Sequence, residues 1–166
     1  MADITLIEKK SFMHSGALQK ILALGVLVLM FLFFALASPV FATKSNIISI
    51  LLATAVNGVL AVGVTFVVIT GGIDLSIGTG MTFASVMTGV AVTNLGLPIP
   101  IGILVGLGTG AFIGFVNGIS VAKLKIPAFI ATLGMMMITK GLSLVVSGAK
   151  PIYFIDTPNF SKLSTG

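Results

Sequence analysis

The sequence of 166 residues contains no cysteine and one histidine, His14, and all nine of its basic residues are lysines. The absence of cysteine excludes disulfide bonds, thiolate metal sites and cysteine nucleophiles. Only four acidic residues are present: Asp3 and Glu8 near the start of the chain, and Asp74 and Asp156, which lie far from them and from each other. No acid–base pair and no set of metal ligands converges from so few ionisable side chains, which argues against an enzyme and against a bound metal ion or cofactor.

The chain has few charged residues and an unusually large share of apolar ones. Charged residues make up 8% of the chain and hydrophobic residues 57%, and the mean hydropathy is +1.22. Soluble domains usually carry about 25% charged residues and roughly 45–50% apolar ones. Residues 21–43, 45–73 and 75–122 contain no charge, and an uncharged apolar run of 18 or more residues is a candidate membrane helix. We therefore expect an all-α polytopic membrane protein in contact with membrane lipid.

The apolar runs predict about five transmembrane helices between two polar ends. The predicted cytoplasmic tail is 1–20 and the predicted extracytoplasmic segment is 149–166. The predicted spans of the transmembrane domain (21–148) are 21–43, 47–70, 75–93, 99–122 and 127–148. The alternative for the first span is a cleaved signal peptide, because two small-x-small patterns, at 35–37 and 40–42, resemble cleavage sites.

The lysines indicate the topology. With the N-terminus inside, five lysines (Lys9, Lys10, Lys20, Lys123 and Lys125) lie in inner segments, and three (Lys44, Lys150 and Lys162) lie in outer segments. This modest bias agrees with the positive-inside rule. No basic patch is interleaved with aromatic residues, which argues against a nucleic-acid partner.

One polar stretch, residues 71–80, interrupts the apolar runs and contains four glycines and Asp74. Four glycines in ten residues disfavour a continuous helix, and Asp74 followed by Ser76 is typical of a helix start. We therefore expect a broken membrane helix whose second half begins near Asp74. Irregular backbone at membrane depth is tolerated only inside protein or beside a wet cavity, so this break, including Gly72, is the candidate functional site. Asp74 could also serve only as a helix cap.

Polar residues on either side of the break extend this candidate site. Asn57 and Thr65 share one stripe of the second predicted span, and Asn57 lies near mid-bilayer. Asn57 could line a pathway or only form an interhelical hydrogen bond. Ser76 and Thr79 begin a similar stripe on the third span. We include these side chains among the translocation-pathway candidates.

The fourth predicted span carries a glycine at every fourth position: Gly102, Gly106, Gly110, Gly114 and Gly118. Each step of four residues advances about 40° around a helix, so these glycines form a slowly winding bare ridge. Such a ridge allows another helix to approach closely. We expect it to serve helix packing rather than ligand binding.

The fifth predicted span begins at Pro127 and contains a lysine. Lys140 lies about 12 Å from the end of the span at Gly148. Its long aliphatic stem allows the ammonium group to reach the interface. We therefore leave two roles open for Lys140, a snorkelling or structural one and a direct role in transport.

Two motifs resemble those of a known family. Residues 67–78 read VVITGGIDLSIG, and Asn117-Gly118 is followed by KIPAFIATLGMM at 125–136. Both resemble the conserved stretches of ribose-type sugar permeases of ABC importers, a group related more distantly to branched-chain amino-acid permeases. The second motif adds Asn117, Pro127, Phe129 and Thr132 to the candidate residues. Lys140-Gly141 stands where the family usually has Arg-Gly, and we add Lys140 as well.

The resemblance implies a multi-pass permease subunit of the bacterial plasma membrane that does no covalent chemistry. Its implied partners are a second permease subunit, a separate ATP-binding subunit that holds ATP and magnesium, and an extracytoplasmic sugar-binding protein. ATP binding and hydrolysis would bias inward-open and outward-open states of the permease pair.

Members of that family are about twice as long, and the resemblance covers their N-terminal half. A fragment, a truncated non-functional permease and one half of a split permease all fit this length. A stand-alone membrane scaffold or small channel is the alternative from another class, and the glycine ridge fits it equally well.

Overall fold

The computed structural model describes residues 16–154, and every regular element in that range is a helix. The chain divides into two compact units, Met1–Gly58 and Val59–Gly166. The boundary falls inside the helix α3 (Lys44–Ile69), and each unit is described by itself. The predicted all-α membrane architecture is confirmed.

The first unit contains α2 (Gly16–Ala37), a turn and the first part of α3. The helix α2 ends six residues before the predicted limit of 43, because Pro39 cannot continue a helix and disfavours helical backbone before it. The ring of Phe41 in the turn lies 5.3 Å from that of Phe31 and 5.7 Å from that of Phe34. The Asn46 amide donates a hydrogen bond of 2.7 Å to the Phe41 carbonyl. Together these contacts fix the turn.

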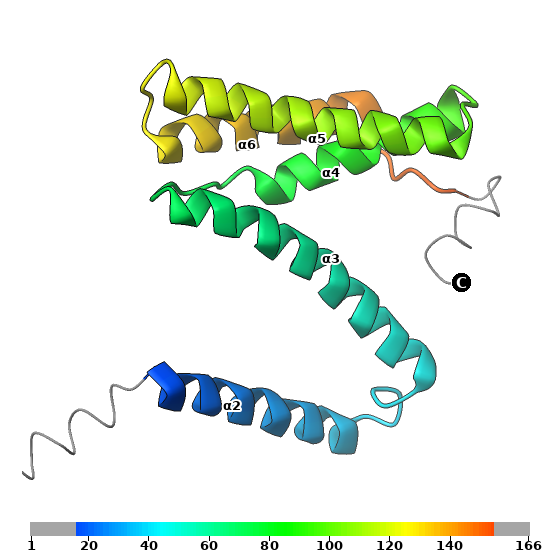
Figure 1. The fold of residues 1–166 in the computed structure, drawn as a ribbon. Helices are drawn as coiled ribbons and strands as arrows, with labels where there is room; N and C mark the ends of the chain where they lie inside the picture. Colours follow the sequence, from blue (N-terminus) through cyan, green and yellow to red (C-terminus); the bar gives the residue numbers. More distant parts are fainter. Residues whose placement is uncertain (1–15, 155–166) are drawn as a thin grey trace, which may run out of the picture. The chain divides into compact units, whose positions relative to one another are not determined.

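In the second unit a short helix packs against two long ones. The helix α4 (Ile77–Gly89) continues as a π-helix, η1 (Val90–Asn94), and contacts both α5 (Ile99–Ala122) and α6 (Ala128–Ser147). Figure 1 shows these three helices side by side. Thirteen residues of α-helix cover about 20 Å, which is shorter than a hydrocarbon core of about 30 Å. The helix α4 by itself is therefore too short to cross a membrane, and η1 extends it by five residues.

Four helices in the described range are long and apolar enough to cross a membrane: α2, α3, α5 and α6. The predicted number of spans, about five, is close to this number. The third predicted span, 75–93, corresponds to α4 with η1, and its helix begins at Ile77. Residues 77–80 of the expected break are therefore helical, and only the part before Ile77 is irregular.

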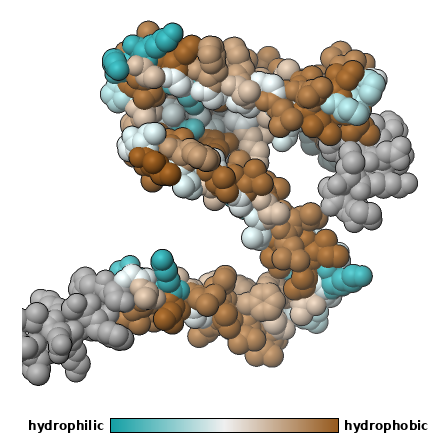
Figure 2. Space-filling view, in the orientation of Figure 1, coloured by the Kyte–Doolittle hydropathy of each residue, from teal (hydrophilic) through white to brown (hydrophobic). Residues whose placement is uncertain are grey.

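The helices carry most of their apolar side chains on the outside. No residue of α2 or α3 is buried, and the buried hydrophobic residues in the described range are Ala91, Val92, Ile113 and Met135. Figure 2 shows brown, hydrophobic residues over most of the visible helix surfaces. Exposed apolar surface on this scale fits contact with lipid or with further protein rather than with water.

The glycine ridge of α5 has two parts with different surroundings. A Cβ atom added at Gly102 would overlap Val92 Cγ2, and one added at Gly106 would overlap Thr88 Oγ1. The backbone of α4 therefore approaches α5 closely at these two glycines. At Gly110, Gly114 and Gly118 an added Cβ would meet nothing within 4 Å.

We expect Gly102→Ala to destabilise the second unit, because Val92 is 4% exposed and its β-branched side chain has little rotamer freedom. Overpacking of this kind costs about 1–3 kcal/mol. The measurement is the midpoint of SDS-induced unfolding in mixed micelles, followed by circular dichroism. The control is Gly108→Ala on the same helix, where an added Cβ meets open space. Equal midpoints for the two variants would contradict the close approach.

Candidate functional site

The break begins where two glycines end α3. Gly71 has a φ of +74°, a left-handed conformation that favours glycine. The N–H of Gly72 donates to the Val67 carbonyl and the N–H of Gly71 to the Val68 carbonyl, at 3.1 and 2.9 Å. This pair of bonds is a Schellman motif, and it satisfies carbonyls that the end of the helix would otherwise leave free. Two of the four glycines in 71–80 therefore form the stop signal of α3.

Asp74 organises the middle of the break. Its Oδ1 accepts the backbone N–H of Ser76 at 2.8 Å and the Ser76 hydroxyl at 2.7 Å. The first of these bonds is an Asx turn. Ser76 occupies the N-cap position of α4, and no side-chain capping bond is formed there. Asp74 thus fixes the residue that precedes the helix and does not cap the helix itself.

A buried hydrogen bond connects the break to α5. The Asn117 side-chain amide donates to Ser76 Oγ at 2.9 Å, and the two residues are 9% and 1% exposed. The Ser76 hydroxyl accepts this bond and donates its own hydrogen bond to Asp74 Oδ1, so Asn117, Ser76 and Asp74 form a continuous chain. Hydrogen bonds in series polarise and strengthen one another. We call these three residues the Asp74 network.

Two threonines connect the same region to α6. Thr132 Oγ1 lies 3.1 Å from the carbonyl oxygen of Ile73 in the break. Thr139, which is 1% exposed, donates to Thr79 Oγ1 at 2.8 Å, and Thr79 donates in turn to the Ser76 carbonyl at 3.1 Å. The break and the start of α4 are therefore held from both neighbouring helices.

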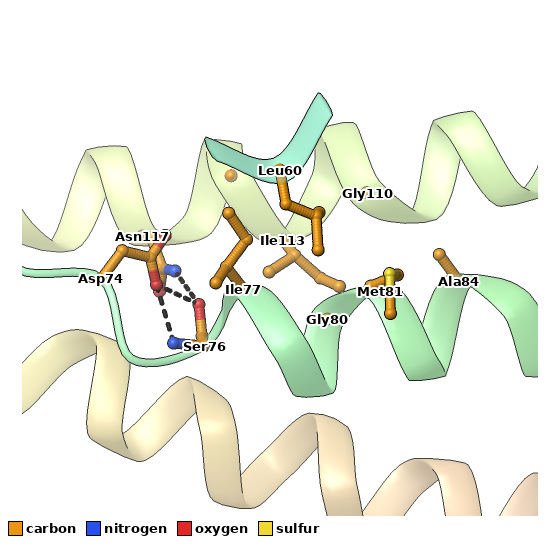
Figure 3. A pocket seen from close by; sticks show the side chains of 11 residues that line it. Leu60, Asp74, Ser76, Ile77, Gly80, Met81, Ala84, Gly110, Ile113 and Asn117 are labelled. Carbon is orange, nitrogen blue, oxygen red and sulfur yellow. Dashed lines mark hydrogen bonds between the residues drawn. The ribbon is translucent and has the colours of Figure 1, made fainter. Parts of the chain in front are cut away.

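The Asp74 network lies at the junction of two cavities in the second unit. One has a volume of about 270 Å³ and lies between Leu60, the start of α4 and the middle of α5. The other has about 540 Å³ and lies between the end of α3, the break and the helices α5 and α6. Asp74, Gly114 and Asn117 line both. Figure 3 shows the three polar side chains meeting at one end of a cavity whose apolar lining includes Leu60, Ile77, Ile113 and Met81.

The open part of the glycine ridge lines these cavities. Gly110 and Gly114 line the smaller cavity, and Gly114 and Gly118 line the larger one. Gly72 also lines the larger cavity, close to Ala128 and to Val67. The ridge expected to serve packing alone is thus divided, with packing at its first two glycines and cavity wall at its last three.

Other candidate residues have no contact with the Asp74 network within the second unit or belong to the first unit. Asn57 belongs to the first unit, and Thr65, exposed on α3, donates only to the Ala61 carbonyl of its own helix at 2.8 Å. Pro127 precedes the first residue of α6, Phe129 is 50% exposed, and Lys140 is exposed on α6. None of the four that belong to the second unit lines either cavity.

Thr139 is a contributor that the sequence analysis missed. It lies seven residues after Thr132 and four before Ser143, and all three are buried on one face of α6. That hydroxyl stripe is visible in the sequence and could have indicated a polar contact with a neighbouring helix.

The site offers hydrogen bonding rather than covalent chemistry. Its groups are a carboxylate, an amide and hydroxyls, with apolar walls on either side. Within residues 16–154, no three His, Cys, Asp or Glu side chains come together as metal ligands. Such a mixture suits a small polar solute with many hydroxyl groups.

Comparison with known proteins finds relatives that are named as import permease proteins. The ribose import permease protein of Haemophilus influenzae is 34% identical over 97% of this chain, and that of Escherichia coli K12 is 42% identical over 69%. The fructose import permease protein of Rhizobium meliloti is 36% identical over 90% of the chain. The matches cover 47%, 36% and 42% of these relatives, so the chain spans less than half of their length. No solved structure matches the chain.

A family model described as the permease component of branched-chain amino acid transport systems matches residues 46–163. That range includes the break, the whole Asp74 network and both threonines of α6 that hold it. The three relatives described above are named as ribose or fructose import permease proteins. The chain therefore belongs to this family of membrane transport permeases.

Proposed function

We propose that this chain forms part of the permease of an ATP-driven importer of a monosaccharide of the ribose type. The observation that carries the proposal is the Asp74 network at the junction of two cavities, inside a chain whose relatives are named for ribose and fructose import. Because those relatives are about twice as long, the activity and the partners of the whole transporter are part of the proposal.

The working transporter requires partners that supply the remaining functions. We infer a second permease subunit or half, a separate subunit that binds ATP with magnesium, and an extracytoplasmic protein that delivers the sugar. ATP binding and hydrolysis would shift the permease between outward-open and inward-open states. We keep the cytoplasmic N-terminus as part of the same proposal because the lysine distribution favours it, and the bacterial plasma membrane because the relatives are bacterial import permeases.

Asp74 is the residue that we expect to contact the sugar. A carboxylate offers about four acceptor sites, and Ser76 occupies two of them through its N–H and hydroxyl. Capacity therefore remains for hydroxyl donors of a sugar. Hydrogen bonds to a charged acceptor are roughly twice as strong as neutral ones, so Asp74 can discriminate a polyol from an apolar solute of the same size.

Ser76 and Asn117 serve to hold that carboxylate in place. We expect Ser76→Ala to lower the stability of the second unit by about 1–3 kcal/mol, because the variant leaves the buried Asn117 amide without its acceptor. The control is Ser120→Ala on α5, since the Ser120 hydroxyl donates only to the Val116 carbonyl of its own helix. The midpoints of SDS-induced unfolding should differ clearly between the two variants. A shift of equal size would mean that the network contributes nothing beyond a local bond.

A charge-dependent role in uptake is tested by Asp74→Asn, with the gene at its native locus in its own host. Asparagine retains an Oδ1 that can accept both bonds from Ser76, so the variant removes the charge and keeps the turn. We expect the initial uptake rate of radiolabelled ribose or fructose to fall about tenfold, as for the loss of a charged hydrogen-bond acceptor.

The control for uptake is Thr54→Val on α3, whose hydroxyl is exposed and donates to the Ile50 carbonyl. It should transport at the wild-type rate, with protein levels compared by immunoblot. Normal uptake by Asp74→Asn would exclude the charge-dependent role. Absence of sugar uptake by the unaltered protein would overturn the proposed function itself.

A further inference from the structure

A third cavity lies at the α4–α6 interface and takes no part in the site described above. Its volume is about 320 Å³, and it lies between α4, α6 and the segment 150–154 that follows α6. We call it the α4–α6 cavity. Four hydroxyl side chains line it, Thr82, Ser85, Ser143 and Ser147, together with Lys150 and Phe154.

The hydroxyl groups in this cavity are arranged as acceptors. Thr82, Ser85 and Ser143 each donate their proton to a backbone carbonyl of their own helix, at 3.0, 2.9 and 2.7 Å. The lone pairs of those oxygens remain available to a ligand. Lys150 brings an ammonium group with three donors, and Phe154 brings an aromatic ring.

This combination matches the two kinds of surface on a monosaccharide. The hydroxyl groups of a sugar ring donate to oxygen acceptors and accept from an ammonium group, and its C–H faces contact aromatic rings. The volume is near the lower end of the usual range for small-molecule sites, about 300–1,000 Å³. A purely lipid-filled groove would not need four hydroxyls and a lysine in its wall.

The position of the α4–α6 cavity relates it to the Asp74 network. Ser85 lies nine residues after Ser76, which is about 13 Å along a helix. The hydrogen bond between Thr139 and Thr79 joins the two helices between these positions, and Thr139 is 1% exposed. The smaller Asp74 cavity and the α4–α6 cavity thus share α4: Gly80, Met81 and Ala84 line the first, and Thr82, Ser85 and Val86 line the second.

We propose that the α4–α6 cavity is a second monosaccharide subsite, which shares α4 with the smaller Asp74 cavity. The inference rests on the proposed function and deepens it, since it gives the transported sugar two binding positions beside α4.

The absence of cysteine allows a direct test by single-cysteine protection. The variants are Ser85→Cys in the α4–α6 cavity, Gly110→Cys in the smaller Asp74 cavity, and Ser45→Cys as an exposed control on α3. The full transporter in native membranes is treated with N-ethylmaleimide, with and without the sugar that it takes up (ribose or fructose). The intact mass of this chain reports the extent of alkylation.

We expect the transported sugar to slow alkylation of Ser85→Cys and of Gly110→Cys about tenfold at a concentration near ten times its Kd, and to leave Ser45→Cys unchanged. Protection of Gly110→Cys alone would overturn the second subsite and leave the proposed function standing. Protection of neither variant would count against both. Equal protection of all three would indicate a global change and would overturn local occupancy of the α4–α6 cavity.

Discussion

The structure depends on one constraint, which is that backbone polar groups at membrane depth must find partners inside the protein. The break after α3 meets it in three ways. The Schellman bonds at Gly71 and Gly72 serve the end of α3, Asp74 receives the N–H of Ser76, and Thr132 reaches the Ile73 carbonyl. An irregular segment in this position is stable because its own residues and the neighbouring helix α6 supply the hydrogen-bond partners that water would otherwise provide.

The same requirement explains the shape of the second unit. Because α4 has only 13 residues, it gains its stability from contact with α5 and α6 rather than from its own length. Gly102 and Gly106 permit the approach on one side, and the hydroxyl stripe of α6 provides polar contacts on the other. Where the glycines of α5 have no neighbour, the bare backbone becomes the wall of a cavity that also contains Asp74.

Much of the candidate site could be predicted, since its chemistry is local. Gly72, Asp74 and Ser76 stand out as polar or flexible residues in an apolar chain, and Asn117 and Thr132 belong to a second recognisable motif. Their contacts with the break could not be derived from the sequence. Asn117 lies 41 positions after Ser76, and Thr132 lies 59 positions after Ile73, so these pairs meet only through the packing of the helices. The glycine ridge shows the same limit, because its period indicates a bare face but does not indicate which glycines have a helix opposite.

The sequence by itself determined the membrane environment, the helical class, the position of the break and the residues able to form polar contacts there. These properties follow from composition and from short-range chemistry: uncharged runs, paired glycines, and a carboxylate two residues before a serine. Only the tertiary structure decided that Asp74 holds Ser76 instead of capping a helix, and that Asn117 and Thr139 complete the contacts. It also decided that two cavities meet at Asp74. The physical reason is that a hydrogen bond between helices depends on their rotation and separation, which the packing of whole helix surfaces determines.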